Sequence, residues 1–240
     1  RYRNKGDLSE ALEWYLKAHK MDPFNRRNHW HVGFTHELLG EYKIAEDLYL
    51  EGLLKHNDSF ECLSALVFYH LNFSRPNKAK YYLDELLRLR PNDNRSVRVA
   101  LSYFLNIKDF DNAMVFGLKI KQQNISDKIS LAFLEKRLKN NEIANKYLTD
   151  AINQLDGWIK SNDQSANAYY QLAKINSLSG DYNKAFDLLE TMVDMGGLNY
   201  KRFMASPFFN NLRNDPRYFK LIDRIKTIID RERIEAGLVS

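Results

Sequence analysis

The chain has 240 residues, of which 44% are hydrophobic and 28% are charged, and its formal net charge is +5. This balance supplies enough apolar side chains for a sizeable core and argues against an intrinsically disordered chain. A single cysteine, Cys62, excludes an internal disulfide framework and a zinc site built from several thiolates.

The sequence gives no sign of a membrane span or of a targeting segment. The longest apolar stretch, LSALVFYHL, is too short to cross a bilayer, and no signal peptide is visible. Because the sequence begins at Arg1 and not at a methionine, we expect it to be a piece of a longer protein. The compartment stays open between periplasm and cytoplasm. Basic residues are dispersed among acidic ones, so we expect this part of the protein to contact neither nucleic acid nor a membrane.

Four alanines recur every 34 residues in the first half of the chain: Ala11, Ala45, Ala79 and Ala113. Each lies in a segment that begins with a turn and ends near a proline or an asparagine, namely 6–23, 40–57, 75–91 and 108–124. A fixed period of this length is typical of stacked helical hairpins.

Two further copies follow, in 129–152 around Ala144 and in 166–193 around Ala185. These two alanines are 41 residues apart, seven more than the period. The excess falls in LDGWIKSNDQSA, residues 155–166, where we expect either a lengthened second helix or a loop.

This pattern resembles the tetratricopeptide repeat family, in which each unit is a pair of antiparallel helices, A and B. The resemblance covers residues 1–197, with the first repeat lacking its helix A, and it implies an all-α superhelix of about five to six repeats. Small residues are expected where the two helices cross, with Gly33 and Ala173 on helix A and the periodic alanines on helix B. Glycine at a turn and proline after a helix predict the element boundaries, namely Gly40, Gly180, Pro23 and Pro91.

The segment NHWHVGFTHELLG holds three histidines, His29, His31 and His36, and raises the question of a metal site. On a helix, His29 and His36 share a face but lie about 10 Å apart, whereas zinc–nitrogen bonds are about 2 Å long. His31 points to the opposite side. His29 and His36 also fall where the repeat family places large packed residues. We therefore interpret them as packing residues and expect no metal ion; a pH-responsive function is the remaining alternative.

No constellation of catalytic residues is recognisable. The sequence has no glycine-rich phosphate loop and no serine flanked by glycines in the manner of a nucleophile elbow. Most carboxylates pair with Lys or Arg at helical spacing on expected solvent faces, as Glu135 does with Lys139. We therefore expect a protein that is not an enzyme and that uses no cofactor.

The resemblance places function on the concave face, which helix A lines. Carrying the family's positions over predicts a groove that is aromatic at one end and basic in its middle. Such a surface suits a peptide or protein with an apolar anchor and an acidic stretch, and a solvated inner face is the alternative. The predicted binding residues are Arg27, Trp30, Phe34, Glu37, Phe68, Arg95, Arg98, Phe133, Lys136, Arg137, Tyr170 and Lys174. The carboxylate clamp of the chaperone-binding members is not expected, because Trp30 and Phe34 replace its lysine and asparagine.

After Gly196 and Gly197 the repeat pattern stops, and residues 198–240 predict a helical cap of the same domain. Serine–proline at 206–207 and aspartate–proline at 215–216 predict two helix starts. An apolar stripe follows, formed by Leu221, Ile222, Ile225, Ile228 and Ile229. We expect this stripe to cover the last repeat; self-association through it is the alternative.

The segment SPFFNNLRNDPRYFKLIDRI, together with the DRERIEAG that follows it, resembles the C-terminal ending of repeat regions in bacterial signalling proteins. These include CadC-like membrane regulators of transcription and class III adenylate cyclases. The resemblance implies a sensor or scaffold half of a larger bacterial regulator. A free-standing scaffold for envelope or secretion machinery and a regulatory domain of a nucleotide cyclase are the alternatives.

Overall fold

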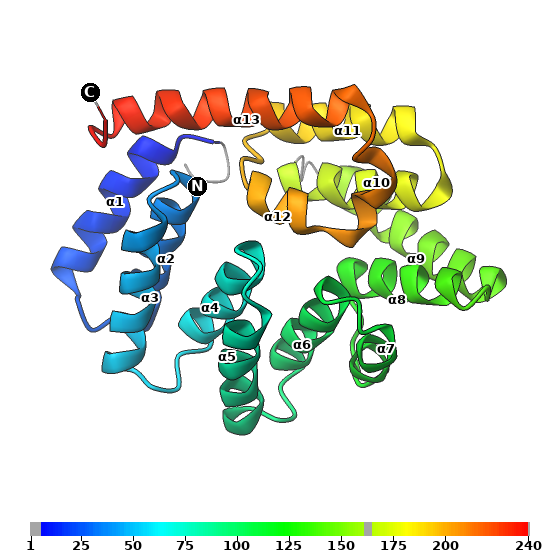
Figure 1. Ribbon diagram of the computed structural model, residues 1–240, viewed down its shortest axis with the longest axis horizontal. Helices are drawn as coiled ribbons and strands as arrows, with labels where there is room; N and C mark the ends of the chain where they lie inside the picture. Colours follow the sequence, from blue (N-terminus) through cyan, green and yellow to red (C-terminus); the bar gives the residue numbers. More distant parts are fainter. Residues whose placement is uncertain (1–5, 161–164, 240) are drawn as a thin grey trace.

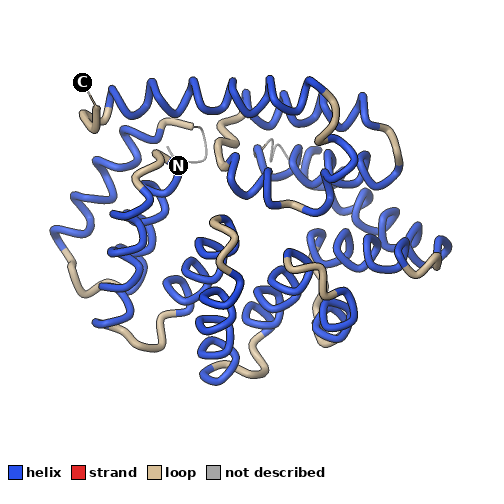
Figure 2. The backbone as a smooth tube through the Cα atoms, viewed as in Figure 1, coloured by secondary structure: helices blue, strands red, loops and turns tan. Residues whose placement is uncertain are grey.

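The structure, a computed structural model, describes residues 6–160 and 165–239. Helices joined by short connections make up this part of the chain, and it contains no strand (Figure 2). None of the helices in the described ranges combines the length and the apolar composition needed to span a membrane. The prediction of an all-α chain is confirmed.

Successive helices pack as hairpins, as the repeat predicts. A first helix, α1 (Leu8–Met21), packs on the first hairpin as a helix B without its partner. Five hairpins follow: α2 (Arg26–Leu38) with α3 (Tyr42–Lys55), α4 (Phe60–Asn72) with α5 (Pro76–Leu89), α6 (Asn94–Asn106) with α7 (Phe110–Leu118), α8 (Ile125–Arg137) with α9 (Asn141–Lys160), and α10 (Ala166–Ser179) with α11 (Tyr182–Asp194).

Each helix A of these hairpins is preceded by an N-cap residue, whose side chain accepts a hydrogen bond from a backbone N–H of the first turn. These N-caps are Asn25, Ser59, Asp93, Asn124 and Ser165. Because such a cap satisfies an N–H that would otherwise lack a partner, it fixes the residue at which the helix starts. The period that the alanines display is thus present in the caps as well.

The periodic alanines are fully buried at the helix crossings, where the family resemblance expected small residues. A methyl group on Gly33 would lie 2.7 Å from Tyr49 Cε1, so the two helices approach closely at this point. Met21 and Leu89 are the last residues of their helices, two residues before Pro23 and Pro91. The predicted boundaries at the two prolines are therefore confirmed.

The turn from helix A to helix B uses a left-handed backbone conformation in every hairpin. Gly40 and Gly180 have φ of 81° and 86°, as expected for glycine after a helix. The equivalent positions in the other hairpins are Ser74, Lys108 and Lys139, with φ of 55°, 62° and 63°. The fold therefore imposes this conformation even where the sequence offers no glycine.

Most of the surplus lengthens a helix. Helix α9 has 20 residues, against 14 in α3 and α5, which agrees with the first of the two predicted alternatives. The part of the predicted loop at 161–164 lies outside the described residues.

The C-terminal segment does more than cap the last hairpin. It forms α12 (Tyr200–Ala205), a 3₁₀ helix η2 (Pro207–Leu212) and the long α13 (Pro216–Glu235), which starts at the predicted proline. In Figure 1, α13 runs along the top of the molecule from α11 back to α1. The apolar stripe of α13 is buried within the chain, because Leu221, Ile225 and Ile229 join one core cluster with residues of α1, α2 and α11. The superhelix is thus closed into a ring.

Two polar contacts join α13 to the N-terminal part of the chain, where the ring closes. Glu232 on α13 accepts a hydrogen bond from the backbone N–H of Ser9 at 2.9 Å. Arg233 forms an ion pair with Glu41 at 2.8 Å. Inside the ring, α12 contacts α4 and η2 contacts α10, so the C-terminal segment lies against the concave sides of the A helices.

Candidate functional site

A cavity of about 300 Å³ lies on the concave side of the ring. Side chains of five A helices, α2, α4, α6, α8 and α10, line it, together with the segment from Asn199 to Phe208. Half of the predicted binding residues meet there: Trp30, Phe34, Glu37, Phe68, Tyr170 and Lys174. Because one face of each A helix points inward, residues about 34 apart in sequence become neighbours on this wall.

One wall of the cavity is aromatic. Trp30 and Phe34 lie one turn apart on α2, and their rings stack with centroids 5.7 Å apart and planes inclined by 9°. Phe68 on α4 keeps 38% of its surface exposed, a large fraction for a phenylalanine. Partly exposed aromatic rings beside a cavity supply apolar contact area to a bound molecule.

Glu37 is a buried carboxyl group in the same wall. Its two oxygens accept hydrogen bonds from Tyr49 Oη at 2.9 Å and from Asn72 Nδ2 at 3.3 Å. Burial raises the pKa of Glu37 to about 7, and the two hydrogen bonds oppose this rise. Near neutral pH the cavity therefore contains a carboxyl group that is divided between its charged and neutral forms.

Lys174 is the buried cation of the cavity, with only 4% of its surface exposed. Its Nζ donates a hydrogen bond to Gln171 Oε1 at 3.2 Å and lies 4.2 Å from the centre of the Phe208 ring. The pKa of Lys174 is lowered to about 7, chiefly because burial disfavours the charged form and in part because Arg202 repels it, while Asp127 opposes both effects. Tyr170, one turn earlier, is also buried, and its ring lies 5.4 Å from the Arg202 guanidinium.

The remaining predicted residues do not line this cavity. Arg98 forms an ion pair with Asp127 at 2.8 Å and donates to the carbonyl of Gln122. Lys136 donates to the carbonyl of Leu178 at 2.7 Å. Two other arginines lie over aromatic rings, Arg95 over Phe60 and Arg137 over Phe110. The basic side chains predicted for the middle of the groove are therefore engaged by neighbours within the chain.

Arg27 and Phe133 complete the predicted set. Arg27 is exposed at the N-terminus of α2, away from the cavity. Phe133 packs against Phe208 of the C-terminal segment, with ring centroids 5.2 Å apart. The concave surface at α8 is thus covered by the chain's own phenylalanine.

Sequence reasoning missed the cavity residues that the C-terminal segment provides: Asn199, Arg202, Ala205, Ser206, Pro207 and Phe208. The repeat positions could not identify them, because they lie beyond the last repeat. The only signal was the change of pattern after the glycine pair, with a compact run of aromatic, serine and proline residues.

Two of the three histidines of the segment 28–40, His29 and His36, are buried between helices, and His31 is half-buried. His29 is fully buried, and its Nε2 lies 3.3 Å from Lys55 Nζ and 3.7 Å from Glu51 Oε1. His36 is buried as well, and His31 stacks on Tyr15 with ring centroids 4.7 Å apart. Burial lowers the pKa of both His29 and His36. Within the described residues, no three side chains of His, Cys, Asp or Glu are grouped so that they could hold a metal ion.

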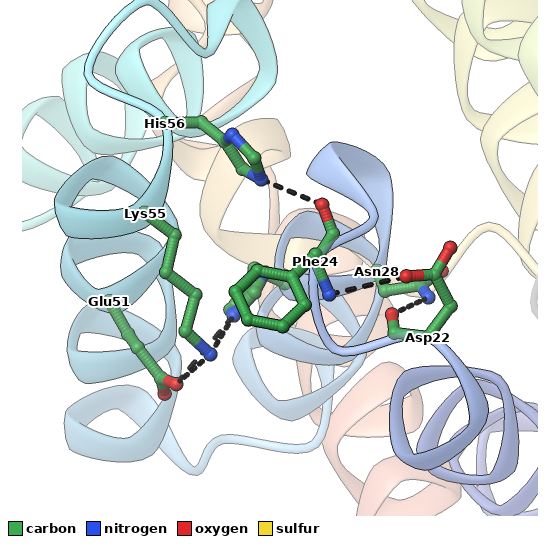
Figure 3. A network of polar contacts seen from close by, with 7 residues as sticks. Asp22, Phe24, Asn28, Glu51, Lys55 and His56 are labelled. Atoms are coloured by element: carbon green, nitrogen blue, oxygen red, sulfur yellow. Dashed lines mark hydrogen bonds and ion pairs between the residues drawn. The ribbon is translucent and has the colours of Figure 1, made fainter.

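The neighbourhood of these histidines shows how the first repeats are joined. Figure 3 shows the His56 ring reaching the Phe24 carbonyl in the turn after α1, with Nε2 and O 2.7 Å apart, and Lys55 reaching Glu51 on its own helix. Asp22 accepts a hydrogen bond from the Phe24 backbone N–H, and its carbonyl accepts one from Asn28 Nδ2. These contacts fix the turn between α1 and α2.

The N-terminal part of the sequence matches a known family. The sequence pattern of the tetratricopeptide repeat matches residues 2–25. A curated relative, "Uncharacterized protein MJ0572" of Methanocaldococcus jannaschii, is 36% identical over 50 residues. The match spans 21% of this chain and 58% of the length of that protein.

Solved structures share the fold along most of the chain. The structure of PilF from Pseudomonas aeruginosa has a TM-score of 0.50 at 13% identity and covers 88% of this chain and 95% of its own. A tetratricopeptide repeat protein from Parabacteroides merdae has a TM-score of 0.51 at 16% identity, with coverage of 95% and 94%. At such identities the likeness shows the fold. The chain thus begins with a recognisable tetratricopeptide repeat and has the helical-repeat fold of tetratricopeptide repeat proteins.

Proposed function

We propose that the chain is a non-catalytic module that binds a protein or peptide through the aromatic wall formed by Trp30, Phe34 and Phe68. The fold suits this use, because stacked helix pairs present an extended inner surface to a partner. The observation that supports it most directly is the exposure of Phe68 beside the stacked pair of α2. An apolar side chain of a partner that enters between these rings would bury aromatic surface now in contact with water.

The acidic stretch first expected in the partner has less support than the apolar anchor. Arg98 and Lys136 already have partners within the chain, as described above. Displacing either contact would leave a buried carboxylate or carbonyl without its donor, which costs free energy. We therefore assign recognition to the aromatic wall and a lesser part to the basic residues.

The wider setting is a second part of the proposal. The C-terminal segment resembles bacterial regulators. This resemblance supports the proposal that the chain is a sensor or scaffold part of a larger signalling or transcription-regulatory protein. The coding sequence upstream of Arg1 tests this. A winged helix with one membrane span supports the regulator, a lipoprotein signal supports an envelope scaffold, and a cyclase domain supports a regulatory domain.

Partner capture followed by quantitative binding tests the site. The partner is first isolated from the source cell with the wild-type chain, and its affinity is then measured for wild type, for Trp30→Ala/Phe68→Ala and for Tyr81→Ala. Tyr81 is an aromatic residue of α5 with 69% of its surface exposed, so it serves as a matched control. Circular dichroism confirms that each variant is folded.

We expect the double variant to lose at least about tenfold in affinity, because truncating a central aromatic anchor costs about 2 kcal/mol or more. The control should bind like the wild type. Equal affinity in all three would place the partner elsewhere on the molecule and contradict the proposed site.

A further inference from the structure

Two positively charged side chains face the same cavity without a carboxylate partner. Lys174 comes from α10 and Arg202 from α12, and both line the cavity. Across the described ranges, no carboxylate oxygen lies within 4.0 Å of either cation, although sixteen such pairs of a lysine or arginine with a carboxylate occur elsewhere. Asp127, the carboxylate that acts on Lys174 from a distance, is already bound to Arg98.

The structural contacts of the buried Lys174 are few: between elements, its Nζ lies over the Phe208 ring, 4.2 Å from the ring centre. Its hydrogen bond joins it to Gln171, which is three residues earlier on the same helix and therefore adds nothing to the packing between elements. Burying an ammonium group costs several kcal/mol unless an opposite charge or hydrogen bonds compensate it. A methionine or leucine would fill the same space under Phe208 without that cost. The contact with Phe208 offsets part of the cost of burying the ammonium group, and an anion in the cavity would offset more of it.

The rest of the cavity combines polar groups with an aromatic wall. Ser126 and Asn106 line it from the neighbouring A helices, and Asn199 lines it from the C-terminal segment. Ser206 is buried beside the Tyr170 hydroxyl and makes no hydrogen bond of regular geometry with the described residues. The wall of Trp30, Phe34 and Phe68 provides the apolar surface. Such a site can hold one charged group and one flat or aliphatic body.

The size of the cavity fits a small molecule. A second cavity of about 450 Å³ adjoins the first and shares Phe34, Tyr170, Asn199 and Arg202 with it. Ligand pockets in proteins enclose about 300 to 1,000 Å³. Arg202 therefore lies between two spaces that together suffice for a compact organic ligand.

We propose that this cavity binds a small organic anion, with a carboxylate or phosphate group between Lys174 and Arg202 and an apolar body against Trp30, Phe34 and Phe68. The anion would favour the charged form of Lys174 and offset its repulsion from Arg202. At the two cations a small molecule is favoured over a peptide end, because η2 lies against α10 there and Phe208 covers Lys174. Its apolar body would compete with the proposed protein partner for the aromatic wall. The ligand would also connect α10 to α12 and so join the repeat helices to the C-terminal segment.

Isothermal titration calorimetry on the full chain tests the proposal with four small probes and one peptide. Phenylacetate and phenyl phosphate carry the two anionic groups, 2-phenylethanol is the uncharged analogue, and inorganic phosphate lacks the apolar body. The variants are Lys174→Met, Arg202→Met and, as a control, Lys121→Met. Lys121 is an exposed cation outside the cavity, and Arg202 is largely exposed, so its variant should fold even if the Lys174 variant does not.

We expect at least one of the two aromatic anions to bind the wild type at least about tenfold more tightly than 2-phenylethanol and inorganic phosphate. Lys174→Met and Arg202→Met should each weaken that binding by about tenfold or more, since each removes a charge-assisted contact. Lys121→Met should bind like the wild type.

Three results would overturn the proposal. The first is that neither anion binds the wild type at millimolar concentration, and the second is that 2-phenylethanol binds as tightly as the anions. The third comes from a hexapeptide that ends in a phenylalanine carboxylate: binding of this peptide, with no binding of phenylacetate, would make the anion part of a polypeptide. The titration contains no protein partner, so its failure is distinct from failure of the protein-binding proposal.

Discussion

At the scale of single residues, the left-handed turn positions show how the repeat constrains the backbone where the sequence is unfavourable. Ser74 and Lys108 stand 34 and 68 residues after Gly40 and adopt the same turn, with positive φ. A side chain in this conformation costs about 1 to 2 kcal/mol relative to glycine. The cost is tolerated because the two helices on either side of the turn bury their alanine crossing.

Replacing Lys108 with glycine should therefore be neutral or stabilising by up to about 1 kcal/mol, because glycine reaches positive φ without strain. Lys146→Gly is the matched control, since Lys146 is an exposed lysine inside α9. It should lose about 1 kcal/mol. Urea unfolding of the two variants and the wild type measures the difference, and equal losses in both would show that the turn carries no strain.

The raised pKa of Glu37, about 7 against an ordinary value of 4.5, predicts how the stability of the protein depends on pH. The folded state holds its proton more tightly than the unfolded state does. The stabilising contribution of protonation is therefore complete below pH 4.5 and is lost as the pH rises through 7. The buried histidines His29, His36 and His70 have lowered pKa values and act in the opposite sense below their ordinary pKa of 6.5.

The Glu37→Gln variant separates the two effects, because it keeps a side chain of the same size and removes the titration. Between pH 4.5 and 7 the free energy of unfolding of the wild type should fall relative to that of the variant, by an amount on the order of 3 kcal/mol. Chemical denaturation of both proteins across this pH range measures the difference. Parallel pH profiles would mean that Glu37 titrates in the folded protein as it does in water.

At the scale of elements, the closeness of helices A and B depends on small residues at their crossings. In the hairpin of α2 and α3, a Cβ on Gly33 would meet Tyr49 Cε1 at 2.7 Å and Cδ1 at 3.0 Å. In α9, a Cβ on Gly157 would meet nothing within 4 Å. Replacing glycine with alanine is therefore expected to crowd the crossing of α2 and α3 but to meet open space in α9.

Gly33→Ala should lower the free energy of unfolding by about 1 to 3 kcal/mol, because the buried Tyr49 cannot move aside without disturbing its neighbours. Gly157→Ala should raise it by up to about 1 kcal/mol through the better helix propensity of alanine. Thermal and urea unfolding of the pair test this. A stabilised Gly33→Ala would show that α2 and α3 can separate at low cost.

At the scale of the whole molecule, the ring is closed by apolar burial along α13. Ile225 is fully buried in the cluster that also contains Leu8 and Leu12 of α1, Leu189 of α11 and Phe203 of α12. This cluster joins the first helix of the chain to the last hairpin. A second cluster, centred on the helices from α4 to α10, and a small third cluster between α3 and α4 form the rest of the core.

Ile225→Ala should cost about 2 to 5 kcal/mol, as large-to-small changes in a core do. Hydrogen exchange should rise in α1 and α11 more than in α6, because α1 and α11 belong to the cluster that contains Ile225. Ile234→Ala, at a position of α13 with 60% of its surface exposed, should change stability by less than about 0.5 kcal/mol. An equal rise of exchange in α1 and α6 would indicate that the ring unfolds as one unit.

The sequence by itself determined the helices, their boundaries and the small residues at their crossings. These features depend on short-range physics: the period of a helix, the φ preferences of glycine and proline, and the space between two adjacent helices. It also predicted that Trp30, Phe34, Glu37, Phe68, Tyr170 and Lys174 share one inner face, because a fixed repeat places equivalent positions there, and these six residues line the cavity. It could not show which of the predicted residues would find partners within the chain.

Only the tertiary structure decided that the superhelix closes on itself. Lys174 and Arg202 are 28 residues apart in sequence and belong to different packing layers, so no periodicity relates them. Their meeting depends on the accumulated curvature of five hairpins and on the path of the chain after the glycine pair. Curvature is a sum of small rotations between neighbouring repeats, and it is set by side-chain packing along the whole molecule and not by any local motif.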